Sequence, residues 1–124
     1  MRILTNGEQL VGKTVAFAHI AQFATAVTLA TTDNEVIVFE PEYDFEEEDM
    51  FRSRIRIYQP YRAIEYIENH NYVREELGKK GIFDIEAYKQ KEKERREQEN
   101  KKLEELKEKR EREAYERLKL KFEK

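Results

Sequence analysis

The chain has 124 residues, a net charge of -3 and a mean hydropathy of -0.96, with 41% charged residues, a high share for a globular domain. It contains no cysteine, which excludes a disulfide framework and a thiolate metal site, and no apolar run approaches the roughly 18 residues of a membrane span. Residues 1–85 sum to -6 and residues 86–124 to +3, so neither part has the strongly basic balance typical of proteins that bind duplex nucleic acid. We therefore expect a cytoplasmic protein that has no membrane span and no duplex nucleic acid as a partner.

Four segments are rich in β-branched and small residues, or alternate apolar with polar residues, as β-strands do. Asp33-Asn34 predicts a turn between the second and third segments, which should therefore form a hairpin, and Pro41 should end the third. The predicted strands are residues 15–20, 23–31, 35–40 and about 50–59.

Two short helices are expected next. Pro60 suits the first turn of a helix that carries Ile64 and Ile67. Asn71 is a suitable cap for a second helix, which Gly78 should end.

A long charged helix follows. Asp84 is a good N-cap, and Phe83 and Tyr88 have the spacing of a hydrophobic staple, so the helix should run from Ile85 to about Phe122. Residues 89–102 contain no apolar side chain, and Glu-to-Lys or Glu-to-Arg pairs four residues apart each add about 0.2–0.5 kcal/mol of support. The sequence thus predicts an α+β protein: a compact domain with a small antiparallel sheet and short helices in residues 1–84, and a long helix in residues 85–124.

The distal part of this helix regains apolar residues between Leu103 and Phe122. A coiled coil would keep apolar residues at both core positions over three or four heptads, and Arg110 and Glu113 interrupt that pattern. Two interpretations remain open: a solvated single helix, or a short seam that joins chains into a dimer or a larger homo-oligomer.

One strand carries the clearest sign of a ligand. In the segment from Phe51 to Tyr58, a period of two places Arg52, Arg54, Arg56 and Tyr58 on one face. Guanidinium groups about 7 Å apart repel one another unless an anion or carboxylates lie across them. Either acidic residues pair with them, namely Glu35, Glu40 and residues 46–49, or the face binds phosphate with Tyr58 stacking on a base.

Catalytic machinery is not evident. Ser53 is the only serine, and His19 and His70 are the only histidines, without a carboxylate cluster that would make a metal site. Residues 7–14 match the letters of a phosphate-binding loop, but we expect no strand before Gly7 and a strand rather than a helix after Thr14. We predict no catalytic residue, no metal and no cofactor, hence no enzyme.

Several segments resemble a known family of phage proteins. With the long charged tail, the residues in question are Phe17-Ala18-His19-Ile20-Ala21-Gln22-Phe23, Tyr61-Arg62-Ala63-Ile64-Glu65-Tyr66-Ile67 and Gly81-Ile82-Phe83-Asp84. In size and order of segments, over most of its length, the chain resembles the first-described sponge family that antagonises the bacterial Thoeris defence.

The resemblance implies an oligomer in the cytoplasm of the bacterial host that binds a cyclic ADP-ribose isomer, made by a defence TIR-domain enzyme, and sequesters it without cleavage. Arginine would hold the pyrophosphate and an aromatic residue the adenine. The predicted ligand-binding residues are Arg54, Arg56, Tyr58, Phe83, Arg110 and Arg112. Two alternatives remain: a protein-binding inhibitor of another bacterial defence system, similar to an anti-CRISPR protein, and a coiled-coil adaptor with no small ligand.

Overall fold

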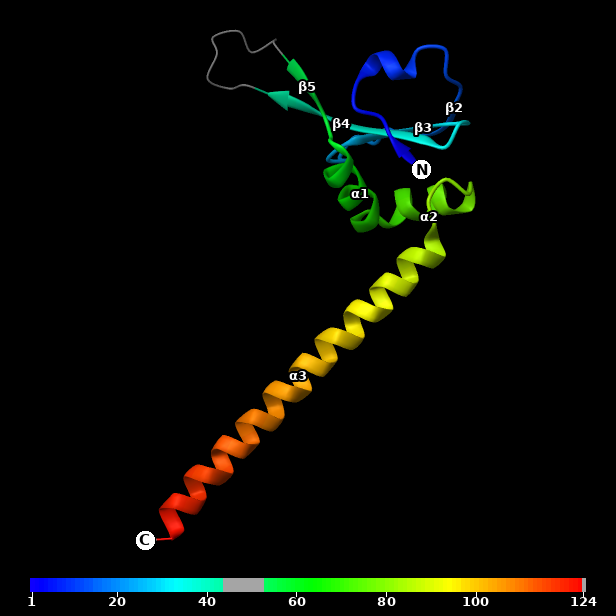
Figure 1. The fold of residues 1–124 in the computed structure, drawn as a ribbon. Helices are drawn as coiled ribbons and strands as arrows, with labels where there is room; N and C mark the ends of the chain where they lie inside the picture. Colours follow the sequence, from blue (N-terminus) through cyan, green and yellow to red (C-terminus); the bar gives the residue numbers. More distant parts are fainter. Residues whose placement is uncertain (44–52, 124) are drawn as a thin grey trace. The chain divides into compact units, whose positions relative to one another are not determined.

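The computed structural model of the protein describes residues 1–43 and 53–123 and has an α+β fold, which confirms the predicted fold class (Figure 1). The chain divides into two compact units, Met1–Ile85 and Glu86–Lys124. The strands are β1 (Arg2–Ile3), β2 (Val15–His19), β3 (Val27–Thr31), β4 (Glu35–Tyr43) and β5 (Ser53–Ile57); the helices are the 3-10 helix η1 (Gly7–Leu10), α1 (Pro60–Asn69), α2 (Asn71–Lys79) and α3 (Ile85–Phe122).

The sheet is built around β4. Strands β2, β3, β4 and β5 pair in antiparallel fashion, whereas β1 pairs with β4 in parallel, Arg2 opposite Glu35. Strand β3 takes one edge of β4, so β1 and β5 share the other. The sheet is therefore antiparallel, as predicted, except for β1, and a two-residue strand is too short to leave a periodic pattern in the sequence.

Strand β4 also passes through Pro41, which the sequence predicted as its end. The backbone groups of Asn34, Val36 and Val38 bond toward β1 and β5, so odd-numbered residues direct theirs to the β3 side. Within the described residues, β3 pairs with β4 only as far as Phe39. The missing N–H of Pro41 therefore costs no ladder hydrogen bond. Strand β3 begins at Val27, not Phe23, and the predicted residues 50–52 of the fourth strand lie outside the described residues.

The core lies on both faces of β4. Val36, Ile37 and Val38 are all at most 2% exposed, although neighbouring residues of a strand point to opposite faces. Figure 1 shows why: α1 and α2 lie along one face of the sheet, and the N-terminal segment with η1 lies along the other. Ala63 and Ile67 of α1, and Val73 and Leu77 of α2, are fully buried on the helical side.

The ends of α2 differ from the prediction. Its N-cap is His70, whose Nδ1 accepts the Val73 N–H at 3.3 Å, and not Asn71. The helix passes through Gly78 and ends at Lys79. The terminating glycine is Gly81 at φ 71, and the N–H groups of Gly81 and Ile82 donate to the carbonyls of Gly78 and Leu77, a Schellman motif.

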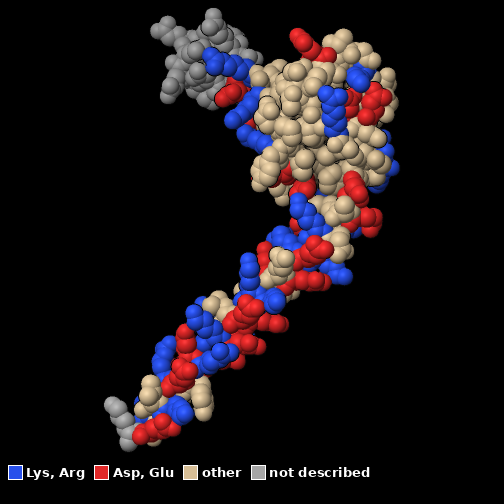
Figure 2. All heavy atoms as spheres, viewed as in Figure 1, with Lys and Arg blue, Asp and Glu red and all other residues tan. Residues whose placement is uncertain are grey.

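Helix α3 begins at Ile85 and ends at Phe122, the predicted bounds. Figure 2 shows basic and acidic side chains interspersed along it. Arg95 contacts Glu92 at 2.9 Å and Glu99 at 2.7 Å. Its hydrogen bond to Glu92 lowers the pKa of the Glu92 carboxyl group. The Arg95 and Glu99 side chains are more than half exposed and that of Glu92 is 28% exposed, so these pairs support the helix and add little tertiary stability.

Candidate ligand-binding site

Arg54 and Arg56 lie on the side of the sheet that α1 covers. In the β4–β5 ladder, Glu40 is opposite Arg56 and Glu42 is opposite Arg54. Directly opposite residues point to the same face. Because the Glu40 carboxylate reaches Arg62 of α1 at 3.4 Å, that face is the helical one. We call Arg54 and Arg56 the arginine face.

A buried tyrosine anchors the next position. Tyr58 is 4% exposed, and its hydroxyl donates to Oε2 of Glu40 at 2.6 Å. Burial first, and the Glu40 carboxylate second, raise the pKa of Tyr58. The Arg62 guanidinium lies over the Tyr58 ring at 4.3 Å and donates to Oε1 of Glu40. Both Glu40 oxygens are thus engaged by Tyr58 and Arg62, although Arg56 is its cross-strand neighbour.

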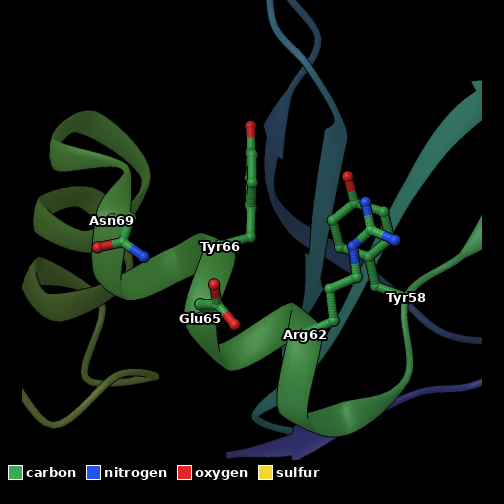
Figure 3. A pocket seen from close by; sticks show the side chains of 5 residues that line it. All are labelled: Tyr58, Arg62, Glu65, Tyr66 and Asn69. Atoms are coloured by element: carbon green, nitrogen blue, oxygen red, sulfur yellow. The ribbon is translucent and has the colours of Figure 1, made fainter.

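A depression opens beside this arrangement, with a volume of about 230 Å³. Figure 3 shows its side chains, which come from one face of α1 and from the residue that follows β5. We call it the α1 depression; its lining residues are Tyr58, Arg62, Glu65, Tyr66 and Asn69.

Tyr66 connects the depression to the interior of the compact unit. Its hydroxyl donates to the Ala26 carbonyl at 3.3 Å, its ring packs edge-on against Tyr58 at 6.0 Å between centroids, and burial raises its pKa. On its other side lies His70 at 5.4 Å, which in turn contacts His19 at 4.9 Å. A continuous row of rings therefore runs between the sheet and the helices.

The two histidines belong to this row. Burial first, and the neighbouring His70 second, lower the pKa of His19. Among the described residues, Nδ1 of His19 and Oγ1 of the opposite Thr28 are buried without a hydrogen-bond partner. No group of three or more His, Cys, Asp or Glu side chains within residues 1–43 and 53–123 is placed to hold a metal ion.

Of the predicted site residues, Tyr58 alone lines the α1 depression, and Arg54 and Arg56 precede it on the same face. Phe83 lies at the C-terminal end of α2 and is 9% exposed, so it presents little ring surface. Arg110 and Arg112 are exposed on α3, in the second unit. The acidic partners considered at residues 46–49 lie outside the described residues.

Sequence reasoning missed four residues of the depression: Arg62, Glu65, Tyr66 and Asn69. Their spacing of three, four and seven residues places them on one face of a helix. That spacing was visible once Pro60 had been assigned to the start of α1. The sequence analysis instead considered only the apolar positions of this helix, Ile64 and Ile67, which indicate the side that faces the core.

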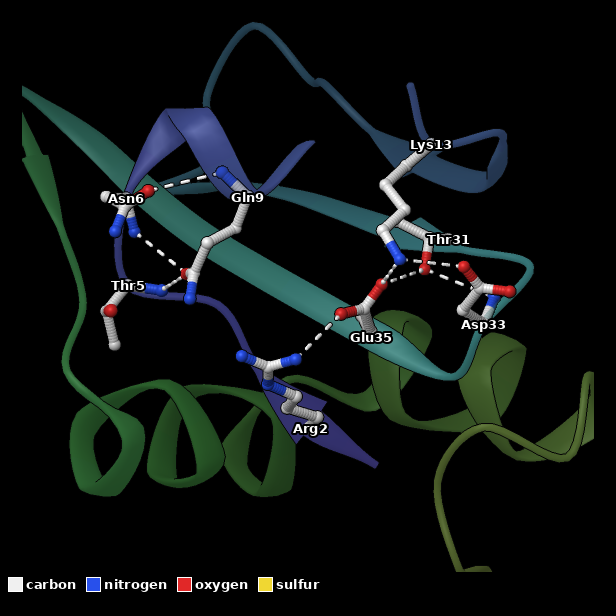
Figure 4. Close-up of polar contacts among 8 residues, drawn as sticks. All are labelled: Arg2, Thr5, Asn6, Gln9, Lys13, Thr31, Asp33 and Glu35. Carbon is white, nitrogen blue, oxygen red and sulfur yellow. Dashed lines mark hydrogen bonds and ion pairs between the residues drawn. The ribbon is translucent and has the colours of Figure 1, made fainter. Parts of the chain in front are cut away.

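The resemblance to a phosphate-binding loop does not extend to structure. A short strand, β1, does precede Gly7, contrary to expectation, but η1 and then β2 follow it. Figure 4 shows that the Lys13 ammonium lies between Asp33 at 2.8 Å and Glu35 at 3.0 Å. These carboxylates raise the pKa of Lys13. Lys13 therefore compensates the 5%-exposed Glu35 and is committed to the fold.

Comparison with protein families supplies an identity. The family model of the Bacteriophage BPS1 gene 21 protein matches residues 1–124. The chain belongs to this phage family. No curated protein and no solved structure matches it. Among the helices of the described residues, none combines the length and the apolar character that crossing a membrane requires.

Proposed function

We propose that this member of the Bacteriophage BPS1 gene 21 family binds a cyclic ADP-ribose-type signalling nucleotide in the cytoplasm of the bacterial host and sequesters it without cleavage, thereby blocking Thoeris immunity. The family match supports a phage protein. The ligand class rests on the chemistry of the site and on the family resemblance in the sequence. The observation that carries the proposal is the arrangement of a cationic strand face beside a ring-lined depression.

The arginine face suits the pyrophosphate. Two guanidinium groups on alternate residues of one strand are about 7 Å apart and can hold successive phosphate groups, each by paired hydrogen bonds. Glu40 accepts hydrogen bonds from Tyr58 and Arg62, so it has a role in the fold besides any neutralisation of Arg56.

The α1 depression suits a single ring. Pockets that hold whole drug-sized ligands have volumes of about 300–1,000 Å³, and this one has about 230 Å³. A base would enter it and leave the phosphates outside, toward Arg56. The guanidinium of Arg62 already covers the Tyr58 ring, so the base stacks against the guanidinium plane and the flank of Tyr66.

We further propose that the ligand leaves unchanged. The chain has one serine and no cysteine, and both histidines pack against tyrosine rings, with His70 also capping a helix. Sequestration then has to lower the free ligand by stoichiometry. Recovery of a hydrolysed product at more than one turnover per protomer would establish an enzyme instead.

A homo-oligomer is part of the proposal. Apolar side chains on α3 are exposed, among them Tyr115, Leu118 and Phe122, and a second copy would cover them. That copy could also supply Arg110 and Arg112 to close the site. The same exposed residues, with Ile20 and Phe23 at 73% and 92% exposure, favour the second candidate function, inhibition of a host defence protein by direct binding.

The deciding experiment is mass spectrometry of small molecules released by heat from the protein purified out of bacteria that carry an active TIR-domain enzyme. The proposal expects one intact cyclic nucleotide per site, and none from cells with an inactive TIR-domain enzyme. Co-purification of a large host protein without any nucleotide would favour the second candidate.

A further inference from the structure

The α1 depression has a polar edge that its stacking surfaces do not explain. Glu65 and Asn69 are one helical turn apart on α1, and both line the depression. Figure 3 shows them on the same side of the helix. Neither is needed to hold an anion, and Glu65 would repel one.

We infer that Asn69 and Glu65 read the edge of the bound base and select an aminopurine over its keto counterpart. This inference rests on the proposed function. An asparagine amide offers one acceptor and two donors, which match the amino group and ring nitrogen along one edge of adenine. An ionised carboxylate only accepts, so Glu65 favours the same amino group and opposes a keto oxygen.

The charges around the depression fix the direction in which a nucleotide enters. The charge of Arg62 is offset by Glu40 at 3.4 Å, and Glu65 adds a negative charge beside it. The phosphates are therefore repelled from the depression and attracted to Arg54 and Arg56. The base is left to meet Asn69 and Glu65.

A second observation supports a preformed site. Tyr66 is held at both ends: its hydroxyl donates to the Ala26 carbonyl, and its ring lies between Tyr58 and His70. Arg62 is held by the Tyr58 ring and by Glu40. The two stacking surfaces are thus fixed before a ligand arrives, and base-edge discrimination requires such rigidity.

The test is a calorimetric titration with a panel of cyclic ADP-ribose isomers, each paired with its hypoxanthine counterpart. Wild-type protein should bind the adenine member of each pair about ten-fold more tightly than the hypoxanthine member, or better. Asn69→Ala and Glu65→Gln should lose most of that preference while keeping their affinity for the hypoxanthine member. Glu8→Gln, an exposed change on η1, is the matched control and should retain the preference.

The outcomes separate the two proposals. If wild-type protein binds both members of a pair equally, or if the Asn69 and Glu65 variants keep the preference, the inference is overturned and nucleotide binding stands. If wild-type protein binds no member of the panel, both are overturned. Circular dichroism of each variant excludes loss of fold as the cause.

Discussion

At the residue scale, the proposed function depends on charged side chains that lie at the surface of the compact unit. Lys13 and Glu35 satisfy each other inside the compact unit, whereas Arg54 and Arg56 are exposed on a strand. The alternation of the fourth predicted strand placed the two arginines on one face, and the strand register agrees. It could not reveal that Tyr58, two residues further on, would be buried under Arg62, because the partner comes from a helix that the strand pattern does not encode.

Arg56→Ala tests the arginine face. Loss of one charge-assisted hydrogen-bonding group should weaken nucleotide binding by about 1.5–3 kcal/mol, or roughly ten- to a hundred-fold. Calorimetric titration measures this, with circular dichroism as the check on folding. The rival account, in which Arg56 only pairs with carboxylates, expects reduced stability and unchanged affinity; native affinity in a folded variant would remove Arg56 from the site.

Acid should destabilise the protein through His19. Because His19 has a lowered pKa in the folded state, the stability it contributes is present above its ordinary pKa near 6.5 and is lost as pH falls below it. Among the described residues, the rings that pack against His19 are His70 and Tyr72, and neither is acidic.

Urea unfolding at pH 7 and at about pH 5 measures this effect. His19→Phe preserves a ring in the row and removes the titrating group, so its stability should fall less between the two values than that of the wild type. An equal loss in both proteins would assign the acid sensitivity to other groups.

At the element scale, the sequence predicted most helices and strands and failed at their ends. Strand β4 continues through Pro41 because, among the described residues, β3 does not extend beyond Phe39 to pair with it there. That depends on the tertiary arrangement of the strands, which the local sequence does not show. The N-cap of α2, His70, was missed because histidine is not among the usual capping residues. The side chain of Asn71, the predicted cap, accepts a hydrogen bond from the Arg74 guanidinium instead of capping the helix. Helix α3 was predicted best, since local propensity and charge spacing alone determine it.

Gly78→Ala should destabilise the compact unit, although alanine is the better helix former by about 1 kcal/mol. A Cβ at Gly78 would collide with Cγ1 and Cδ1 of Ile85, the first residue of α3. Overpacking of this kind costs about 1–3 kcal/mol. A lower urea midpoint with unchanged slope is expected. Gly7→Ala, where a Cβ meets nothing within 4 Å, should leave the midpoint unchanged; a stabilised Gly78→Ala protein would show that Ile85 moves aside freely.

At the scale of the whole molecule, α3 poses the question of assembly. At 100° per residue, Tyr115, Leu118 and Phe122 form one short stripe, whereas Leu106 and Leu120 lie on the opposite side. All five side chains are at least 45% exposed. The earlier expectation of a seam from Leu103 to Phe122 therefore reduces to its distal end, and whether chains associate there stays a prediction.

Leu118→Glu should dissociate the oligomer, because each apolar side chain of the stripe contributes about 1.5–3 kcal/mol on burial. Light scattering at micromolar concentration should report at least a dimer for the wild type and a monomer for the variant. Leu120→Glu carries the same charge on the other side of the helix and should remain associated. A strictly monomeric wild-type mass would remove oligomerisation from the proposal.

The parallel pairing of β1 with β4 has a consequence for the order of folding. Strands β2, β3 and β4 follow one another along the chain, so short turns bring them together, whereas β1 reaches β4 only after the whole intervening segment has closed. During synthesis β1 leaves the ribosome before β4, and it has no partner strand until β4 has emerged. We therefore expect Ile3 and Leu4, which is buried in the folded protein, to stay exposed until β1 can pair with β4.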